Sequence, residues 1–157
     1  MHRDQLKKIF GVGPLGALIS LGLLAITAGI NYYGDVGAIT RHTTLVHRVG
    51  GLLVGLGLGL HIWSFVTLRN WWAQNRLCTD GPFRYLRHPM YAAWITFIAT
   101  GFVLIMNVWS YLVWLVLLHP IWHALVRKEE KAMRHHFGET YRSYAAQTGR
   151  FLPRMSG

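Results

Sequence analysis

Acidic residues, cysteine and charge in general are scarce in this sequence. Asp and Glu together make up 6 of the 157 residues, against 16 Lys and Arg, so the formal net charge is +10. The single cysteine, Cys78, excludes an internal disulfide. Charged residues are 14% of the chain, whereas about 25% is usual in soluble domains. Together with 52% hydrophobic residues, these shortages exclude a disordered polar chain and an ordinary soluble surface.

Three long stretches carry no charged residue at all: Ile9–Asn31, Val49–Leu68 and His88–Val126. A helix needs about 20 apolar residues to cross the hydrocarbon core of a bilayer. The third stretch is too long for one crossing, and Asn107 near its middle indicates a tight helical hairpin. We therefore predict an all-α integral membrane bundle of about four spans in a single domain. The expected spans are residues 13–30, 46–68, 91–106 and 109–126, within a domain over residues 1–157.

The segment after the fourth span differs from the spans in its pattern. Across residues 127–147, apolar residues recur near helical spacing with Arg, Lys, Glu and His between them. Gly138 is a candidate break between two helices in this segment. We expect the segment to be amphipathic and to lie over the cytoplasmic face of the membrane.

The distribution of basic residues predicts the orientation. All Lys and Arg except Arg41 and Arg48 fall in the N-terminal segment, in the loop after the second span or in the tail. An even number of crossings places these three regions on one side, which the positive-inside rule assigns to the cytoplasm together with both termini. The basic charge is expected to contact anionic membrane lipids. Nucleic acid is not an expected partner, because no soluble basic-aromatic module is present.

Two glycine patterns suggest packing rather than ligand binding. Residues 11–16 match the dinucleotide-binding pattern G-x-G-x-x-G, but no strand precedes them and no βαβ unit surrounds them. We interpret this match as the entrance to the first helix. In the second span, Gly51, Gly55 and Gly59, with Gly57 between them, form a row of small residues, which predicts close helix–helix packing within the bilayer.

The histidines leave one alternative function open. His47 and His61 are about four turns apart on one face of the second span, as in a haem-binding electron carrier. Such a carrier needs a matching pair on a second helix, and His119 and His123 are only one turn apart. No metal site is predicted. Nucleophilic catalysis finds no support either, because Cys78 has no evident partner and G-x-S-x-G is absent.

The polar residues that suggest chemistry gather at one end of the predicted hairpin. Residues 79–91 lead into the third span, and residues 127–130 leave the fourth. Since the two spans are antiparallel neighbours, we expect these clusters to face each other. A purely structural alternative is that Glu129 pairs with Arg84 or Arg87 at the membrane boundary.

Residues 81–91, Gly-Pro-Phe-Arg-Tyr-Leu-Arg-His-Pro-Met-Tyr, resemble the signature of the isoprenylcysteine carboxyl methyltransferase family. The tail resembles the family's second block in Glu129-Glu130, Phe137-Gly138-Glu139, Tyr141, Tyr144 and Arg150-Phe151-Leu152-Pro153. The two blocks stand in the family's order, and a hydrophobic hairpin separates them. The resemblance covers about residues 75–153, roughly half the chain. The wider superfamily includes phospholipid N-methyltransferases.

This resemblance implies an enzyme that uses S-adenosylmethionine and releases S-adenosylhomocysteine. The residues that it implies for cofactor binding are Asn75, Leu77, Cys78, Phe83, His88, Pro89, Met90, Tyr91, Glu129 and Glu130. Arg87, Arg127 and Tyr91 are implied in catalysis. The arginines would steer an anionic acceptor or a lipid headgroup, and the ring of Tyr91 would flank the sulfonium by cation–π attraction.

The resemblance also bears on the methyl acceptor. Family members that act on prenylcysteine have Tyr at the position of Phe83 and Arg at the position of Leu125, where Arg127 is the nearest arginine. A lipophilic carboxylate or thiol entering from the bilayer is the expected acceptor. A phospholipid amine is the alternative within the enzyme class, and a non-catalytic membrane scaffold is the alternative outside it.

Overall fold

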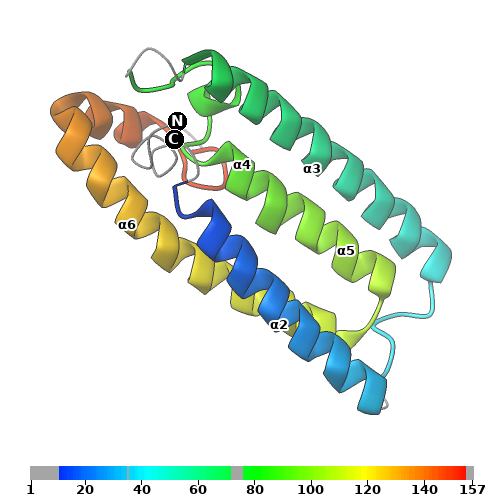
Figure 1. Ribbon diagram of the computed structural model, residues 1–157. Coiled ribbons are helices and arrows are strands. Elements are labelled where there is room, and N and C mark those ends of the chain that lie inside the picture. The colour runs from blue at the N-terminus through cyan, green and yellow to red at the C-terminus, as the bar shows by residue number, and fades with distance from the viewer. Residues whose placement is uncertain (1–10, 35, 72–75, 155–157) are drawn as a thin grey trace.

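The computed structural model describes residues 11–34, 36–71 and 76–154 and consists of helices joined by short loops (Figure 1). The helices are α2 (Gly13–Tyr33), α3 (Thr43–Trp71), the 3-10 turn η2 (Gly81–Arg84), α4 (Pro89–Ala92), the π-helical segment η3 (Ala93–Ile98), α5 (Ala99–Met106) and α6 (Trp109–Gln147). Since α4, η3 and α5 form one continuous span, four helices are long and apolar enough to cross a membrane. The all-α, four-span prediction is confirmed, and the protein is an integral membrane protein.

The observed helices are longer than the predicted spans. Residues 31–33 extend the first, residues 43–45 and 69–71 extend the second, and α6 runs beyond residue 126. The predicted spans end where the apolar residues end. Helical hydrogen bonding continues beyond them, through the polar and aromatic residues at the membrane interface.

The spans pair in an order that differs from their order in the chain. α3 packs along the third span, α2 packs along α6, and α5 also contacts α6 (Figure 1). The third span therefore lies between α3 and α6. Tertiary packing of this kind brings the start of the third span beside the part of α6 that follows residue 126.

Glycines permit the close approach of α3 to the third span. A Cβ atom built at Gly101 would lie 2.5 Å from the carbonyl oxygen of Gly50. A Cβ atom at Gly57 would lie 2.6 Å from Cγ1 of Ile98 and 2.9 Å from Cβ of Phe97. Small residues at such positions let helix backbones touch within a bilayer.

Only part of the predicted glycine row in the second span packs against protein. Around Gly51, Gly55 and Gly59, a Cβ atom would meet nothing within 4 Å among the described residues. Gly50 and Gly57, seven residues apart, share the buried face of α3 instead. The prediction of packing was right for the span and for Gly57, and wrong for Gly51, Gly55 and Gly59.

Two tryptophans of α6 hold α2 in place by hydrogen bonds to one buried serine. The indole of Trp122 donates to the Ser20 hydroxyl, and the indole of Trp114 donates to the Ser20 carbonyl, both at 3.0 Å. The Ser20 hydroxyl in turn donates to the Gly16 carbonyl at 2.7 Å. Hydrogen bonds between helices stabilise association where lipid offers no partner.

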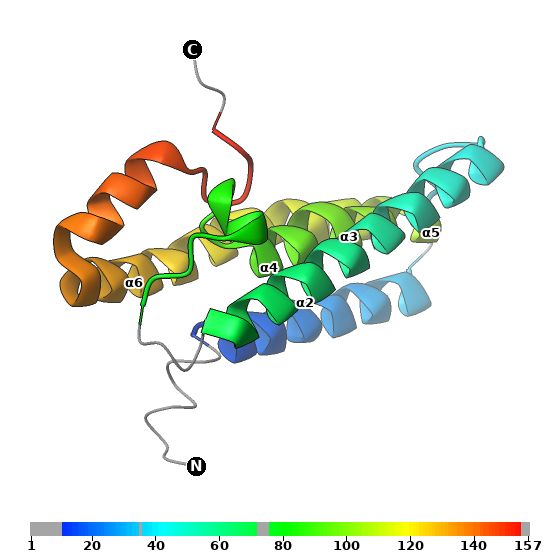
Figure 2. The ribbon, with the colours of Figure 1, turned by 90° about the horizontal axis from the view of Figure 1, so that it is seen from above.

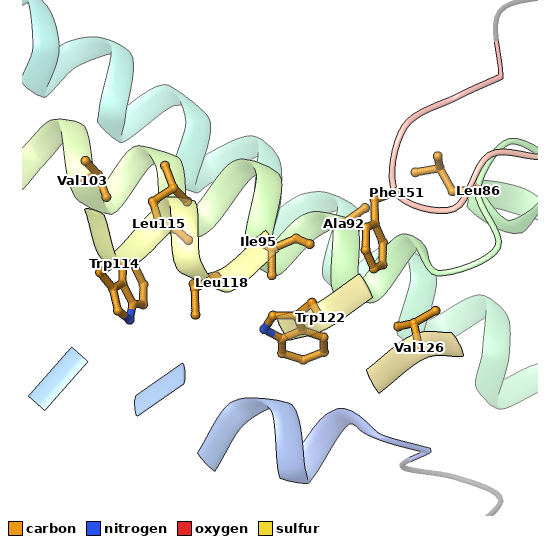
Figure 3. Packing of buried hydrophobic residues seen from close by; sticks show 11 residues of the cluster. Leu86, Ala92, Ile95, Val103, Trp114, Leu115, Leu118, Trp122, Val126 and Phe151 are labelled. Carbon is orange, nitrogen blue, oxygen red and sulfur yellow. The ribbon is translucent and has the colours of Figure 1, made fainter. Parts of the chain in front are cut away.

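A cluster of buried side chains lines the interior from the third span to the C-terminal segment (Figure 3). Its labelled members are Leu86, Ala92, Ile95, Val103, Trp114, Leu115, Leu118, Trp122, Val126 and Phe151. The outer faces carry large apolar side chains, such as Leu18 at 70% exposed and Val116 at 61%. A core inside and an apolar exterior are what a bilayer-embedded bundle requires.

The hairpin between the third and fourth spans turns at Asn107, as predicted. Asn107 has φ 51° and ψ 37°, the left-handed conformation that ends α5. Its side-chain amide donates to the Thr40 carbonyl at 2.8 Å, and its side-chain oxygen accepts from the Thr40 amide at 3.1 Å. Asn107 thus closes one hairpin and fixes the loop that joins α2 to α3.

The last part of α6 folds back over the end of the bundle where α2 begins and α3 ends (Figure 2). The predicted break at Gly138 is confirmed, because its φ of 55° and ψ of −127° lie outside the helical region. Residues 127–137 continue the fourth span without a break, and the segment after Gly138 reverses direction. The hydroxyl of Tyr144 on this segment donates to the Phe83 carbonyl at 2.7 Å.

We expect Gly101→Ala to lower the free energy of unfolding by roughly 1–3 kcal/mol, the usual cost of overpacking. The added methyl would meet the backbone of Gly50, which cannot rotate away. Thermal unfolding in detergent measures the change. Gly59→Ala is the matched control, since it adds the same methyl where no atom lies within 4 Å. Equal unfolding temperatures in the two variants would contradict the packing argument.

Candidate active site

A cavity of about 460 Å³ lies at the end of the bundle where α2 begins and α3 ends. Its walls come from Gly11, from the end of α3, from the loop before the third span, and from the part of α6 beyond residue 128. The side chains that line it include Leu68, Trp71, Leu77, Cys78, Phe83, Arg87, His88, Glu129, Met133, Phe137, Tyr141 and Tyr144. The volume lies in the usual range for small-molecule sites, about 300–1,000 Å³.

Local sequence sets the shape of the loop before the third span. Gly81 has φ 52°, and Pro82 follows it within the 3-10 turn η2. His88 is non-helical, with φ −129° and ψ 61°, because the ring of Pro89 disfavours the helical region for the residue before it. The helix therefore starts at Pro89, and the imidazole of His88 is buried beside the cavity and stacks on the ring of Tyr91.

The Glu130 carboxylate is the centre of a buried ion cluster. Its side chain is 3% exposed and accepts from Arg87 Nε at 2.9 Å. Arg150 binds it with two nitrogens, Nη2 at 2.6 Å to Oε2 and Nε at 3.1 Å to Oε1. Arg87 Nη1 donates in addition to the carbonyls of Ala145 and Thr148. Arg87 therefore pairs with Glu130, whereas the alternative considered from sequence was a pair with Glu129.

The segment after α6 pairs with the loop before the third span. The Arg87 amide donates to the Gly149 carbonyl at 2.8 Å, and the Gly149 amide donates to the Tyr85 carbonyl at 3.2 Å. Phe151 packs edge-on against the rings of His88 and His123. His88 therefore contacts both Tyr91 and Phe151. Nothing in the spacing of the sequence indicated that Arg150 would reach Glu130.

Glu129 faces the cavity and contacts different partners from Glu130. Its Oε2 accepts from the Tyr91 hydroxyl at 3.1 Å and from the Val12 amide at 3.3 Å. Its Oε1 lies 3.9 Å from Nδ1 of His88. The two neighbouring carboxylates thus have different surroundings: Glu130 lies inside the ion cluster, and Glu129 lies on the cavity wall.

The structure brings together most of the residues that the resemblance implied. Those that line the cavity are Leu77, Cys78, Phe83, Arg87, His88 and Glu129. Pro89 directly follows His88, and Met90 follows Pro89 at the start of the third span. Tyr91 bonds to Glu129, and Glu130 bonds to Arg87. Arg127 is exposed and is not part of the lining. Asn75 lies outside the described residues.

Sequence reasoning missed several lining residues. Leu68 and Trp71 come from the end of α3, and Gly11 comes from the start of α2. Met133 lies on the apolar side of the segment that follows the fourth span. The apolar spacing of that segment was the available signal, but it did not indicate that this side faces a cavity rather than the membrane.

The other chemistries considered from the sequence were nucleophilic catalysis by Cys78 and metal or haem binding by histidines. Burial is the main cause that raises the pKa of the Cys78 thiol above its usual value, so the thiol stays protonated at neutral pH. The described residues contain no group of three His, Cys, Asp or Glu that could hold a metal ion. α3, which carries His47 and His61, packs along a span, Pro89–Met106, that has no histidine.

We expect Glu130→Gln to destabilise the protein by about 3–5 kcal/mol, the usual cost of removing one partner from a buried ion pair. The two guanidinium groups of Arg87 and Arg150 would then lie close together without a balancing charge. Thermal unfolding in detergent is the measurement. Glu139→Gln is the control, because Glu139 and its partner Arg142 are 78% and 67% exposed and such pairs contribute about 0–1 kcal/mol. Similar effects of the two substitutions would refute the role given to Glu130.

Comparison with known proteins identifies the family. The family model described as phospholipid methyltransferase (PEMT) matches residues 45–140, more than half of the chain. No curated protein and no solved structure matches the sequence. The matched residues run from α3 through the loop and the third span to α6 beyond Gly138, and they carry Cys78, His88 and Glu129. The chain therefore belongs to the phospholipid methyltransferase family of membrane methyltransferases, which the isoprenylcysteine carboxyl methyltransferase-like enzymes share.

Proposed function

We propose that the protein transfers a methyl group from S-adenosylmethionine to a lipophilic acceptor at the cytoplasmic face of the membrane, as isoprenylcysteine carboxyl methyltransferases do. The observation that carries this proposal is the cavity in which Glu129, His88 and aromatic side chains meet at the start of the third span. Family membership makes methyl transfer the reaction class.

The chemistry of the cavity fits the methyl donor. Glu129 offers a carboxylate to an ammonium group or to ribose hydroxyls. Nε2 of His88 is buried and makes no hydrogen bond among the described residues, and its distance to Glu130 Oε1 is 3.6 Å. The rings of Phe83, Phe137 and Tyr141 supply apolar faces for a nucleoside base or a sulfonium.

S-adenosylmethionine supplies an electrophilic methyl group on its sulfonium when it is bound. The protein contributes position, which can lower a barrier by several kcal/mol. Glu129 and His88 would hold the polar parts of the donor, and the aromatic walls would exclude water. Arg87 donates from Nε to Glu130 and from Nη1 to the carbonyls of Ala145 and Thr148, so we assign it the task of holding the loop rather than binding the acceptor.

The acceptor would enter from the lipid side. The position at which prenylcysteine enzymes carry an arginine is Leu125, which is buried, and Arg127 is exposed outside the cavity. Of the arginines that line the cavity, Arg76 lies over the ring of Trp71 at 5.7 Å and Arg87 lies in the ion cluster.

A phospholipid amine is the second candidate for the methyl acceptor, and the description of the matched family favours it.

We place the cavity end of the bundle in the cytoplasm. Arg76, Arg84 and Arg87 lie at that end, whereas Arg41 and Arg48 lie near the opposite end of α3. A soluble donor would then reach the cavity from the cytoplasm while the acceptor stays in the bilayer. Protease protection of the residues after Gln147 in vesicles of known sidedness tests this placement.

Calorimetric titration of S-adenosylhomocysteine into the detergent-purified protein tests the donor site. We expect micromolar binding that weakens by about tenfold or more in Glu129→Gln, since hydrogen bonds to charged groups contribute about 1.5–3 kcal/mol. Glu139→Gln, an exposed carboxylate on the same helix, is the control and should bind like the wild type. A folded wild-type protein that does not bind would overturn the proposal.

A labelled-methyl assay separates the two acceptor classes. Vesicles that contain phosphatidylethanolamine and vesicles that contain a prenylcysteine analogue are incubated with the same protein and labelled S-adenosylmethionine. We expect label in the prenylcysteine analogue if the acceptor is a carboxylate. Label in the phosphatidylethanolamine alone would establish the second candidate and reject the first.

A further inference from the structure

The glycine-rich entrance of α2, residues 11–13, touches two residues of the proposed donor site. The Val12 amide donates to Glu129 Oε2 at 3.3 Å, and that oxygen also accepts from the Tyr91 hydroxyl at 3.1 Å. Gly11 lines the cavity itself. From the sequence, the G-x-G-x-x-G match at residues 11–16 was interpreted only as a helix entrance. In the structure, its first residue also forms part of the cavity wall.

Gly11 is restricted by space and by conformation at the same time. A Cβ atom at Gly11 would lie 2.7 Å from Glu129 Oε2 and 2.9 Å from its Cδ. Its φ of 46° lies in the left-handed region that side chains disfavour. Gly13 differs, because its φ is not positive and a Cβ atom there would be 3.4 Å from the Tyr91 ring, an ordinary contact.

The contact orients the carboxylate. Val12 and Tyr91 both donate to Oε2, so Oε1 is left on the side of His88, which is also a lining residue. A carboxylate held in this way loses little conformational freedom when it binds a ligand, and preorganisation of this kind increases affinity.

We propose that Gly11 is a positioning residue of the methyl-donor site, which sets the orientation of Glu129 by letting the first span approach it without a side chain. α2 lies outside the residues that match the family model, 45–140, so the match assigns this contact no role. The inference rests on the proposed function, because it concerns the same carboxylate.

The first test is the affinity of Gly11→Ala for S-adenosylhomocysteine, measured by calorimetry. We expect binding about tenfold weaker than in the wild type, with an unfolding temperature in the absence of ligand close to that of Gly138→Ala. Gly138 is the matched control because its φ of 55° is also positive and a Cβ atom there would meet nothing within 4 Å among the described residues. A Gly11→Ala variant that unfolds, or that binds like the wild type, overturns the assignment.

A double-mutant cycle with Glu129→Asp gives a readout that a merely structural glycine would not change. Aspartate is shorter by one methylene group, which makes room for the methyl group added at position 11. We therefore expect Gly11→Ala to weaken binding less in the Glu129→Asp background than in the wild type. Equal losses in both backgrounds overturn the assignment.

The outcomes also distinguish a failure of this inference from a failure of the proposed function on which it rests. A wild-type protein that does not bind S-adenosylhomocysteine rejects the donor site, and the assignment of Gly11 with it. Binding by the wild type that Glu129→Gln weakens and Gly11→Ala leaves intact rejects the assignment of Gly11 alone.

Discussion

The buried carboxylate of Glu130 is the charge around which the site end of the molecule is organised. A carboxylate that is 3% exposed needs partners, and it takes Arg87 from the loop and Arg150 from the segment after α6. Three segments far apart in the chain are thereby fixed against one another. Glu129 is the preceding residue on the same helix, about 100° around the axis, and so points to the cavity instead.

Most of the fold could be predicted because a bilayer imposes simple rules on a sequence. Uncharged runs of sufficient length gave the spans, and Asn107 gave the hairpin turn. The helix partners could not be predicted in the same way. Between Val49 and Leu68, α3 carries no charged residue on any face. The sequence therefore does not distinguish the face that packs on protein, with Gly50 and Gly57, from the face with Gly51 and Gly55.

The candidate site could be predicted in part because polar residues stand out in an apolar chain. The lining of one cavity does include Glu129 together with Leu77, Cys78, Phe83, Arg87 and His88. The partner of Arg87 and the exposure of Arg127 depend on helix rotation and on the path of the C-terminal segment, which the order of residues does not reveal. Gly11 lacks a side chain, so only its surroundings in three dimensions could indicate a role.

The ion cluster also has a consequence for the order in which the protein is made. Arg87 and Glu130 flank the third and fourth spans, and Arg150 follows both. During synthesis the hairpin can enter the bilayer before Arg150 leaves the ribosome, but His88 gains its second neighbour, Phe151, only afterwards. A nascent chain with all four spans inserted would still lack a finished cavity. The site is therefore completed only after the residues that follow the fourth span have been synthesised.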